Sequence, residues 1–378
     1  MAAQPATTFP FANLPLPDHP TEAPQTSNEP WLRMIAGDAS DRKFYRLEGA
    51  KIGAICMRFP KWQGGYGGDP ISWLGMHKAL VQMGLPVPEV LLVDEEKACI
   101  WTEDFGDNFL NCAMNGDLLD ARKPSCAESI NHYLQALDLL VMAQYPQKPV
   151  IEHPALKLSF DTEKLMFELR FFVTHFLNGF LGMNATEENP EWAPLFNDFR
   201  NLSQWLDRRS RVLCHRDYHV RNVMVVDGRA KWIDFQDARM GPHAYDVVSL
   251  VRDSYIKIPS ATRKILYSHY FTKMNAARTS LSIPALPLRE FDIEVIHMGL
   301  QRNIKAIGSF GYLATTKGKP GYLSYVKSTL ETLCDPMNYQ AFDIDLQREY
   351  PAVMRLIFDL QSGTLRSHLN ETLTKFGQ

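Results

Sequence analysis

The stretch HRDYHVRN, residues 215–222, places a dense group of charged and polar residues directly after the apolar run Val212–Cys214. The apolar segments Val223–Val226 and Lys231–Phe235 follow, separated by Asp227-Gly228, a dipeptide that strongly favours a tight hairpin turn. We therefore expect a β-hairpin whose base lies beside the polar stretch.

This hairpin would gather three oxygen-bearing side chains. A three-residue loop places Asn222 opposite Asp234, a two-residue loop makes them diagonal neighbours, and the sequence leaves both open. Amide and carboxylate oxygens are ligands that Mg²⁺ uses beside substrate phosphates, so Asn222 and Asp234 are the expected metal ligands. Asp217, five residues upstream of Asn222, is placed to accept a proton from an attacking hydroxyl. The alternative is a polar loop whose charges are merely solvated.

The order of these residues resembles the kinase pattern H-R-D-x-x-x-x-N followed by D-F-G. Here it reads His215-Arg216-Asp217 with Asn222, and then Asp234-Phe235-Gln236. Gln236 stands where the pattern has glycine, and this change leaves the expected metal ligand Asp234 in place. The pattern predicts catalytic roles for Asp217, Asn222 and Asp234.

The distribution of apolar residues indicates a small β-rich part followed by a large helical part. Between residues 31 and 102, short alternating segments predict strands at Trp31–Ala36, Lys43–Leu47, Gly53–Phe59, Glu89–Val93 and Ala98–Thr102, with one helix at 69–83. Beyond residue 103, helical periodicity dominates in Ala127–Ala143, Thr162–Leu181, Leu195–Arg209, Ala261–Ala277, Leu288–Ser309, Tyr322–Leu333 and a pair near 351–375.

These patterns predict an α+β, two-lobed, protein-kinase-like fold. Residues 31–102 form an antiparallel nucleotide-binding lobe with one helix, and residues 103–378 form a mainly helical catalytic and substrate lobe. Residues 1–30 hold seven of the 24 prolines and no Lys or Arg, and we expect an arm that is disordered or loosely docked and that catalysis does not need.

Composition and charge narrow the class of protein. The net charge of −3 and the pI of about 6.4 show no basic excess for nucleic acid binding. The chain has no apolar segment long enough to predict a membrane span, and its first basic residue, Arg33, comes too late for a signal peptide. Its six cysteines form no CxxC motif. We expect a cytoplasmic, monomeric protein with a small-molecule substrate.

Four blocks resemble one bacterial branch of the aminoglycoside-phosphotransferase-like kinases. They are GDASDRKFYR at 37–46, CHRDYHVRN at 214–222, IDFQDARMGPHAYDVVSLVRD at 233–253 and MGLQRNIKAIGSF at 298–310. Characterised members of the branch are anomeric kinases of N-acetylmuramate and N-acetylglucosamine in cell-wall recycling. The resemblance implies ATP and Mg²⁺ as cofactors and a sugar 1-kinase activity.

Nucleotide binding is expected to involve the first strands and the inter-lobe segment. Gly37 and Ser40 lie between the first two strands, where backbone N–H groups approach phosphate in kinases. The usual third-strand lysine and its helix glutamate are absent, so Arg58, Lys61 or Arg42 would supply the cation. Glu103 lies in the stretch 102–106, the predicted hinge for adenine.

Two further residue groups have alternative interpretations. Arg302 and Lys305 lie three apart on a predicted helix and could bind an anionic substrate group, or form a solvated face. Asp246 precedes a predicted helix and serves either as its N-cap or as a brace for the catalytic loop.

Three other functions compete with a sugar kinase. A protein kinase is disfavoured because only twelve positions separate Asp234 from Asp246 and no A-P-E follows. An aminoglycoside- or choline-type phosphotransferase would need an acidic cleft for its cationic substrate. A non-catalytic ATP-binding regulatory protein would fit the missing lysine–glutamate pair but not the complete Asp217, Asn222 and Asp234 set.

Overall fold

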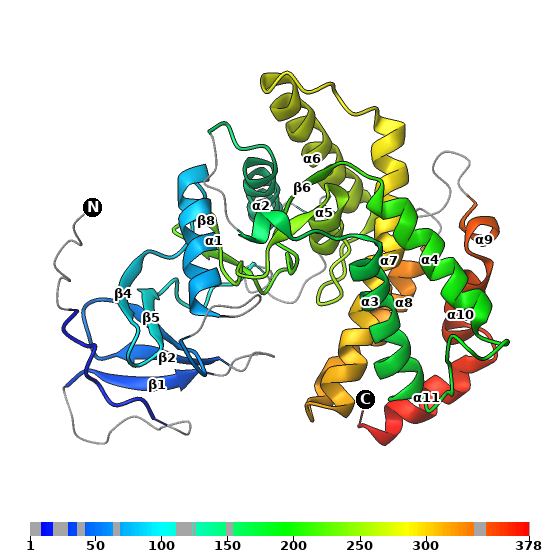
Figure 1. The fold of residues 1–378 in the computed structure, drawn as a ribbon, viewed down its shortest axis with the longest axis horizontal. Helices are drawn as coiled ribbons and strands as arrows, with labels where there is room; N and C mark the ends of the chain where they lie inside the picture. Colours follow the sequence, from blue (N-terminus) through cyan, green and yellow to red (C-terminus); the bar gives the residue numbers. More distant parts are fainter. Residues whose placement is uncertain are drawn as a thin grey trace.

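The computed structural model describes residues 9–17, 29–35, 42–62, 69–110, 123, 126–148, 154–335 and 345–377. Figure 1 shows two lobes, a small β-rich lobe at the left that carries the N-terminus and a larger helical lobe at the right that carries the C-terminus. This is the two-lobed α+β architecture predicted from the sequence.

The small lobe is one antiparallel sheet with a helix against it. The five strands have the order β1-β2-β3-β5-β4, and each neighbouring pair is antiparallel. Helix α1 begins after Asp69, whose carboxylate accepts the N–H groups of Ile71 and Ser72, and ends at Gly84, which is left-handed with φ 82°. The bounds are β1 Trp31–Ile35, β2 Lys43–Glu48, β3 Ala54–Arg58, α1 Pro70–Met83, β4 Val90–Asp94 and β5 Cys99–Glu103.

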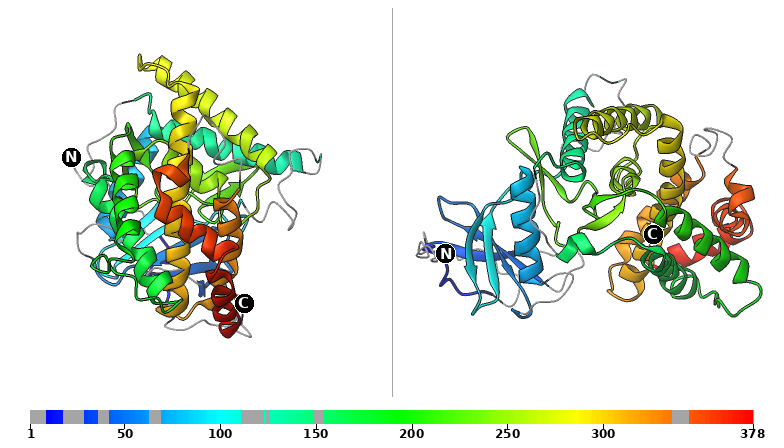
Figure 2. Two further views of the ribbon diagram at one scale, coloured as in Figure 1. Left: turned by 90° about the vertical axis from the view of Figure 1, so that its right-hand side faces the viewer. Right: turned by 45° about the horizontal axis from the view of Figure 1, so that its top comes forward.

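Strand alternation gives the sheet two buried faces. Met57 and Ile100 face α1 and join the main core, whereas Tyr45, Cys56 and Trp101 form a second core on the outer face. The right-hand view in Figure 2 shows α1 between the sheet and the large lobe. Residues that project toward α1 therefore also project toward the space between the lobes.

Residues 9–17 cover the outer core. Phe9 packs on Trp101 with ring centroids 5.0 Å apart, and Phe11 meets Phe9 edge-on at 5.5 Å. Lys97 Nζ donates to the carbonyl of Ala12 at 2.6 Å. Of the two expected states of the arm, residues 9–17 adopt the docked one, because the apolar side chains of Phe9, Phe11, Leu14 and Leu16 pack against the outer core.

The large lobe is mainly helical, and helix α7 runs through it (Figure 1). The bounds are α2 Ala127–Gln144, α3 Thr162–Phe172, α4 Ala193–Asp207, α5 Ala244–Val251, α6 Ser260–Ser280, α7 Leu288–Thr315, α8 Tyr325–Leu333, α9 Leu346–Glu349, α10 Pro351–Gln361 and α11 Leu365–Lys375, with 3₁₀ turns η3 Pro154–Lys157 and η5 Pro320–Ser324. Among the described residues, no helix is both long and apolar enough to cross a membrane.

The helix predicted at 162–181 differs from the one observed. Helix α3 ends at Phe172, and a π-helical turn, η4, covers Val173–Asn178. Helix α7 approaches this point closely, since a Cβ on Gly308 would lie 2.6 Å from Phe172 Cα and one on Gly311 2.6 Å from His175 O. The close approach of α7 is thus possible only with glycine at these positions.

Four short strands surround the polar stretch. The hairpin of β7 Val223–Val226 and β8 Arg229–Trp232 has the two-residue loop, with φ values of 49° and 72° at Asp227 and Gly228. Strand β6, Arg211–Cys214, pairs with β9, Arg239–Pro242. Strand β9 was not expected from the sequence, because Gly241 and Pro242 are poor strand formers. Strand β8 begins at Arg229 and ends at Trp232, earlier in the chain than the expected Lys231–Phe235.

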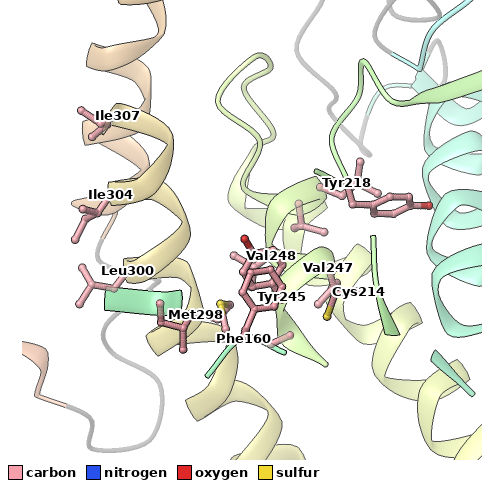
Figure 3. Packing of buried hydrophobic residues seen from close by; sticks show 14 of the residues in the cluster. Phe160, Cys214, Tyr218, Tyr245, Val247, Val248, Met298, Leu300, Ile304 and Ile307 are labelled. Carbon is pink, nitrogen blue, oxygen red and sulfur yellow. The ribbon is translucent and has the colours of Figure 1, made fainter. Parts of the chain in front are cut away.

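Aromatic and sulfur-containing side chains fill the space beneath these strands. Figure 3 shows Phe160, Tyr245 and Met298 close together, with Ile304 and Ile307 farther along α7. The rings of Phe160 and Tyr245 stack with centroids 4.1 Å apart. This core joins α5 and α7 and fixes their relative position.

We predict that Phe9 stabilises the small lobe. Phe9→Ala should lower the free energy of unfolding by about 1–2 kcal/mol, since it exposes part of Trp101 to water. Chemical denaturation of the full chain measures this change, with Glu96→Ala, an exposed residue of the turn between β4 and β5, as the control. Equal stability of both variants would contradict a packed arm.

Candidate active site

A cleft of about 1170 Å³ lies between the two lobes. Its small-lobe wall includes Arg42, Phe44 and Met57, and its large-lobe wall includes Asp217, Asn222 and Asp234. The three predicted catalytic residues therefore line one cavity, which is large enough for a nucleotide and a second small molecule.

Two buried carboxylates hold the loop 215–222. Asp246 accepts the backbone N–H groups of His215 at 2.5 Å and Arg216 at 3.1 Å. Asp253 accepts the N–H of Val220 at 2.9 Å. Asp246 lies inside the first turn of α5, which begins at Ala244, so its role is the brace and not the N-cap. Burial raises the pKa of Asp246 to about 7 against the opposing effect of both N–H groups.

Asp217 projects from this loop toward α7. Its Oδ1 lies 3.1 Å from Lys305 Nζ, and its side chain is 33% exposed in the cleft. Burial raises the pKa of Asp217, but Lys305, Arg216 and Arg302 outweigh burial and hold this pKa well below its usual range. Asp217 is therefore ionised at neutral pH and can orient a hydroxyl group in the cleft.

Asn222 and Asp234 fit a magnesium ion bound together with phosphates. The backbone N–H of Ile233 donates to the carbonyl of Asn222, which places the two ends of the hairpin side by side. The Asn222 amide donates to Asp217 O at 2.8 Å, so its oxygen is the remaining ligating atom. Asp234 is left-handed with φ 59°, a strained conformation that is typical of functional sites. Two oxygen donors are few for an all-protein site but suit Mg²⁺ shared with a nucleotide.

Arg42 is a cation of the small lobe that contacts the expected metal ligand Asp234. Its Nη2 lies 2.9 Å from Asp234 Oδ1, and its side chain is only 7% exposed. Arg58 projects to the opposite face of β3, together with Cys56, and so away from the cleft. Because side chains alternate along β3, Arg58 does not reach the cleft, and the expectation that it binds the cofactor is wrong. Lys61, the other cation expected there, does line the cleft.

The inter-lobe segment is held by ion pairs. Arg46 on β2 binds Asp104 at 2.7 Å and Asp107 at 2.7 Å. Glu103 lies in the cleft wall, and its carboxylate accepts the N–H of Glu89 at 3.3 Å. Glu103 thus occupies the predicted hinge, while Gly37 and Ser40 lie outside the described residues.

Arg302 belongs to a buried network that the sequence analysis missed. Its guanidinium donates to Ser249 Oγ at 2.6 Å and to the Tyr245 hydroxyl at 2.9 Å. The same hydroxyl lies 3.3 Å from Glu168 Oε2, which also accepts from Gln301 at 3.0 Å. Arg302 thus has buried structural partners and also lines the cleft, and its contact with an anionic substrate group stays a prediction. The sequence signal of this network was Glu168, an acidic residue within the apolar segment 165–181.

Comparison with known proteins agrees with this geometry. Residues 31–279, well over half of the chain, match the phosphotransferase enzyme family. The chain belongs to this family. It is 28% identical over 297 residues to the N-acetylmuramate/N-acetylglucosamine kinase of Pseudomonas aeruginosa, covering 77% of this chain and 79% of the relative. It is also 28% identical over 311 residues to the kinase of the same name from Neisseria meningitidis, covering 78% and 84%.

Solved structures support the fold. An ethanolamine kinase from Plasmodium vivax superposes with a TM-score of 0.53 at 12% identity, covering 82% of this chain and 83% of the other. This superposition confirms the kinase-like fold. The family match and the named relatives confirm the family predicted from the sequence, and the chain is a phosphotransferase.

We predict that Lys305 sets the acid limb of the pH–rate profile. A lowered pKa keeps Asp217 ionised as the pH falls, until the pH reaches that low pKa. Lys305→Met removes the nearest cation, so the pKa of Asp217 rises and activity should be lost at a higher pH than in the wild type.

The measurement is kcat/KM against pH with a saturating phosphoryl donor. Lys327→Met, which removes an exposed lysine of α8, is the control and should leave the acid limb in place. An acid limb that does not move in Lys305→Met would contradict the coupling.

Proposed function

We propose that this phosphotransferase transfers the γ-phosphoryl group of ATP to the anomeric hydroxyl of N-acetylmuramate and/or N-acetylglucosamine. The products are the sugar 1-phosphate and ADP. The observation that carries the proposal is the ionised Asp217, 3.1 Å from Lys305 and next to Asn222 and Asp234. The names of the bacterial relatives support the choice of acceptor.

The chemistry assigns a role to each of these residues. The anomeric oxygen attacks the γ-phosphorus, the bond to the β,γ-bridging oxygen breaks, and the sugar proton passes to Asp217. Mg²⁺ held by Asn222 and Asp234 would neutralise phosphate oxygens. Arg42, which contacts Asp234, would bind the same phosphates in place of the missing third-strand lysine.

The low pKa of Asp217 favours an acidic hydroxyl. A carboxylate whose pKa lies well below its usual range is a weak base. Phosphoryl transfer depends mainly on positioning and charge stabilisation, so the proton can leave late. An anomeric hydroxyl is more acidic than an ordinary alcohol and therefore suits such a base.

The cleft is lined by residues of both signs, but the cations beside Asp217 argue against a cationic acceptor. Arg302 and Lys305 line the wall at Asp217 and lower the pKa of its carboxyl group. Choline or an aminoglycoside would meet these cations, whereas a neutral or anionic sugar would not be repelled. As the family resemblance implies, we place the reaction in the cytoplasmic recycling of cell-wall sugars and expect a monomer.

The proposal is tested with a panel of acceptors. Wild-type enzyme with Mg-ATP should phosphorylate N-acetylglucosamine or N-acetylmuramate at the anomeric oxygen, identified by phosphorus NMR. The corresponding alditols lack the anomeric hydroxyl and should be inert. Asp217→Asn should lower the rate by about 10²–10⁴-fold, since it removes the proton acceptor. Phosphorylation of an alditol, or a preference for kanamycin or choline, would refute the anomeric reaction.

We further predict that Arg42, and not Arg58, positions the nucleotide. Arg42→Met should raise KM for Mg-ATP by about 10- to 100-fold, the worth of a hydrogen bond to a charged group. Arg58→Met is the matched control, because this residue projects to the other face of the same sheet. Steady-state kinetics at saturating sugar gives both values, and a larger effect of Arg58→Met would reverse the assignment.

A further inference from the structure

A group of aromatic side chains surrounds Arg221 on the large-lobe wall of the cleft. The guanidinium carbon of Arg221 lies 4.0 Å from the centroid of the Tyr255 ring. Its Nη2 donates to the Tyr325 hydroxyl at 3.0 Å, and its Nη1 donates to the Tyr322 hydroxyl at 3.4 Å. Phe310 stacks on Tyr322 with centroids 6.3 Å apart. Arg221, Tyr255, Phe310 and Tyr322 line the cavity itself.

This cluster adjoins the reacting groups. Arg221 immediately precedes the proposed metal ligand Asn222. On α7, Lys305 contacts Asp217, and Phe310 follows about 7 Å farther along the helix axis. A molecule whose hydroxyl reaches Asp217 would therefore extend toward Phe310, Tyr322 and Arg221.

The chemistry of the cluster matches a sugar acid. Aromatic rings cover the apolar face of a pyranose, and tyrosine hydroxyl groups bond to its oxygens. Arginine carries a planar fork that binds a carboxylate through two parallel hydrogen bonds. The stacking of Arg221 on Tyr255 and its bonds to the hydroxyl groups of Tyr322 and Tyr325 orient the guanidinium before any ligand binds, and a carboxylate would compete with these hydroxyl groups for its N–H groups.

Three other cations line this wall. Lys305 bonds to Asp217, Arg302 is buried with Ser249 and Tyr245, and Arg252 is buried and donates to Thr332 O at 3.3 Å. Lys305 and Arg302 are the two residues that the sequence suggested for an anionic substrate group. Arg221 is the cation of this wall that lies among Tyr255, Tyr322 and Tyr325.

We infer that Arg221, Tyr255, Phe310 and Tyr322 form the acceptor-sugar subsite and that Arg221 binds the lactyl carboxylate of N-acetylmuramate. The inference rests on the proposed function and deepens it, because it assigns the residue that distinguishes the sugar acid from N-acetylglucosamine. Arg221 is thus a specificity-determining residue, and Asp217 acts on both sugars alike.

The test compares kcat/KM for N-acetylmuramate, its carboxyl methyl ester and N-acetylglucosamine. In Arg221→Met, which keeps an unbranched side chain and removes the charge, the value for N-acetylmuramate should fall about 10- to 100-fold relative to that for N-acetylglucosamine. The wild type should prefer the acid to the ester, and Arg221→Met should not. Tyr322→Leu should lower the values for all three substrates together. Arg355→Met, an exposed arginine of α10, is the charge-matched control and should change no ratio.

The outcomes separate this inference from the proposed function. An equal loss for all three substrates in Arg221→Met would mean that Arg221 only ties the loop to η5 and α8, and the subsite assignment would be wrong while the kinase activity stands. A wild-type enzyme that phosphorylates neither sugar would overturn the proposed function together with the subsite. Arg221→Lys adds a check, since a point charge without the planar fork should restore part of the preference for the acid.

Discussion

The active site depends on how α5 holds the loop 215–222. Asp246 accepts two consecutive N–H groups at the beginning of this loop, and Asp253 accepts a third near its end. The loop lies in the interior of the lobe, where an unpaired N–H would cost about 1–3 kcal/mol, so these carboxylates decide its path. Because α5 packs on α7, the same contacts bring Asp217 to Lys305.

The position of Asp217 beside Lys305, Arg216 and Arg302 determines the pKa of its carboxyl group. Burial alone would raise the pKa of a carboxyl group, yet Lys305, Arg216 and Arg302 reverse the direction of the shift. Arg302 can remain buried because Ser249 and Tyr245 accept its N–H groups and the carboxylate of Glu168 lies just beyond. Through its electric field, Arg302 of this network helps to hold the pKa of Asp217 low.

The cleft divides into two sides with different cations. Arg42 of the small lobe meets Asp234, which defines the side for the nucleotide phosphates. Arg221 lies among aromatic rings of the large lobe, which suits the acceptor. Under the proposed function, Arg42 would serve the nucleotide and Arg221 the acceptor, a division in keeping with a reaction that works mainly by positioning.

The sequence by itself determined the features that depend on local spacing. Alternating strands, the Asp227-Gly228 turn and the interval from Asp217 to Asn222 predict the two lobes and bring together the three candidate catalytic residues, because hairpin geometry joins residues that are near in the chain. Only the tertiary structure decided which charged residues meet across the lobes. Arg42 and Asp234 are 192 positions apart, and the choice between Arg42 and Arg58 depends on which sheet face is turned toward the cleft. The packing of Phe9 on Trp101 and of Arg221 on Tyr255 also joins distant segments, and no local pattern encodes such contacts.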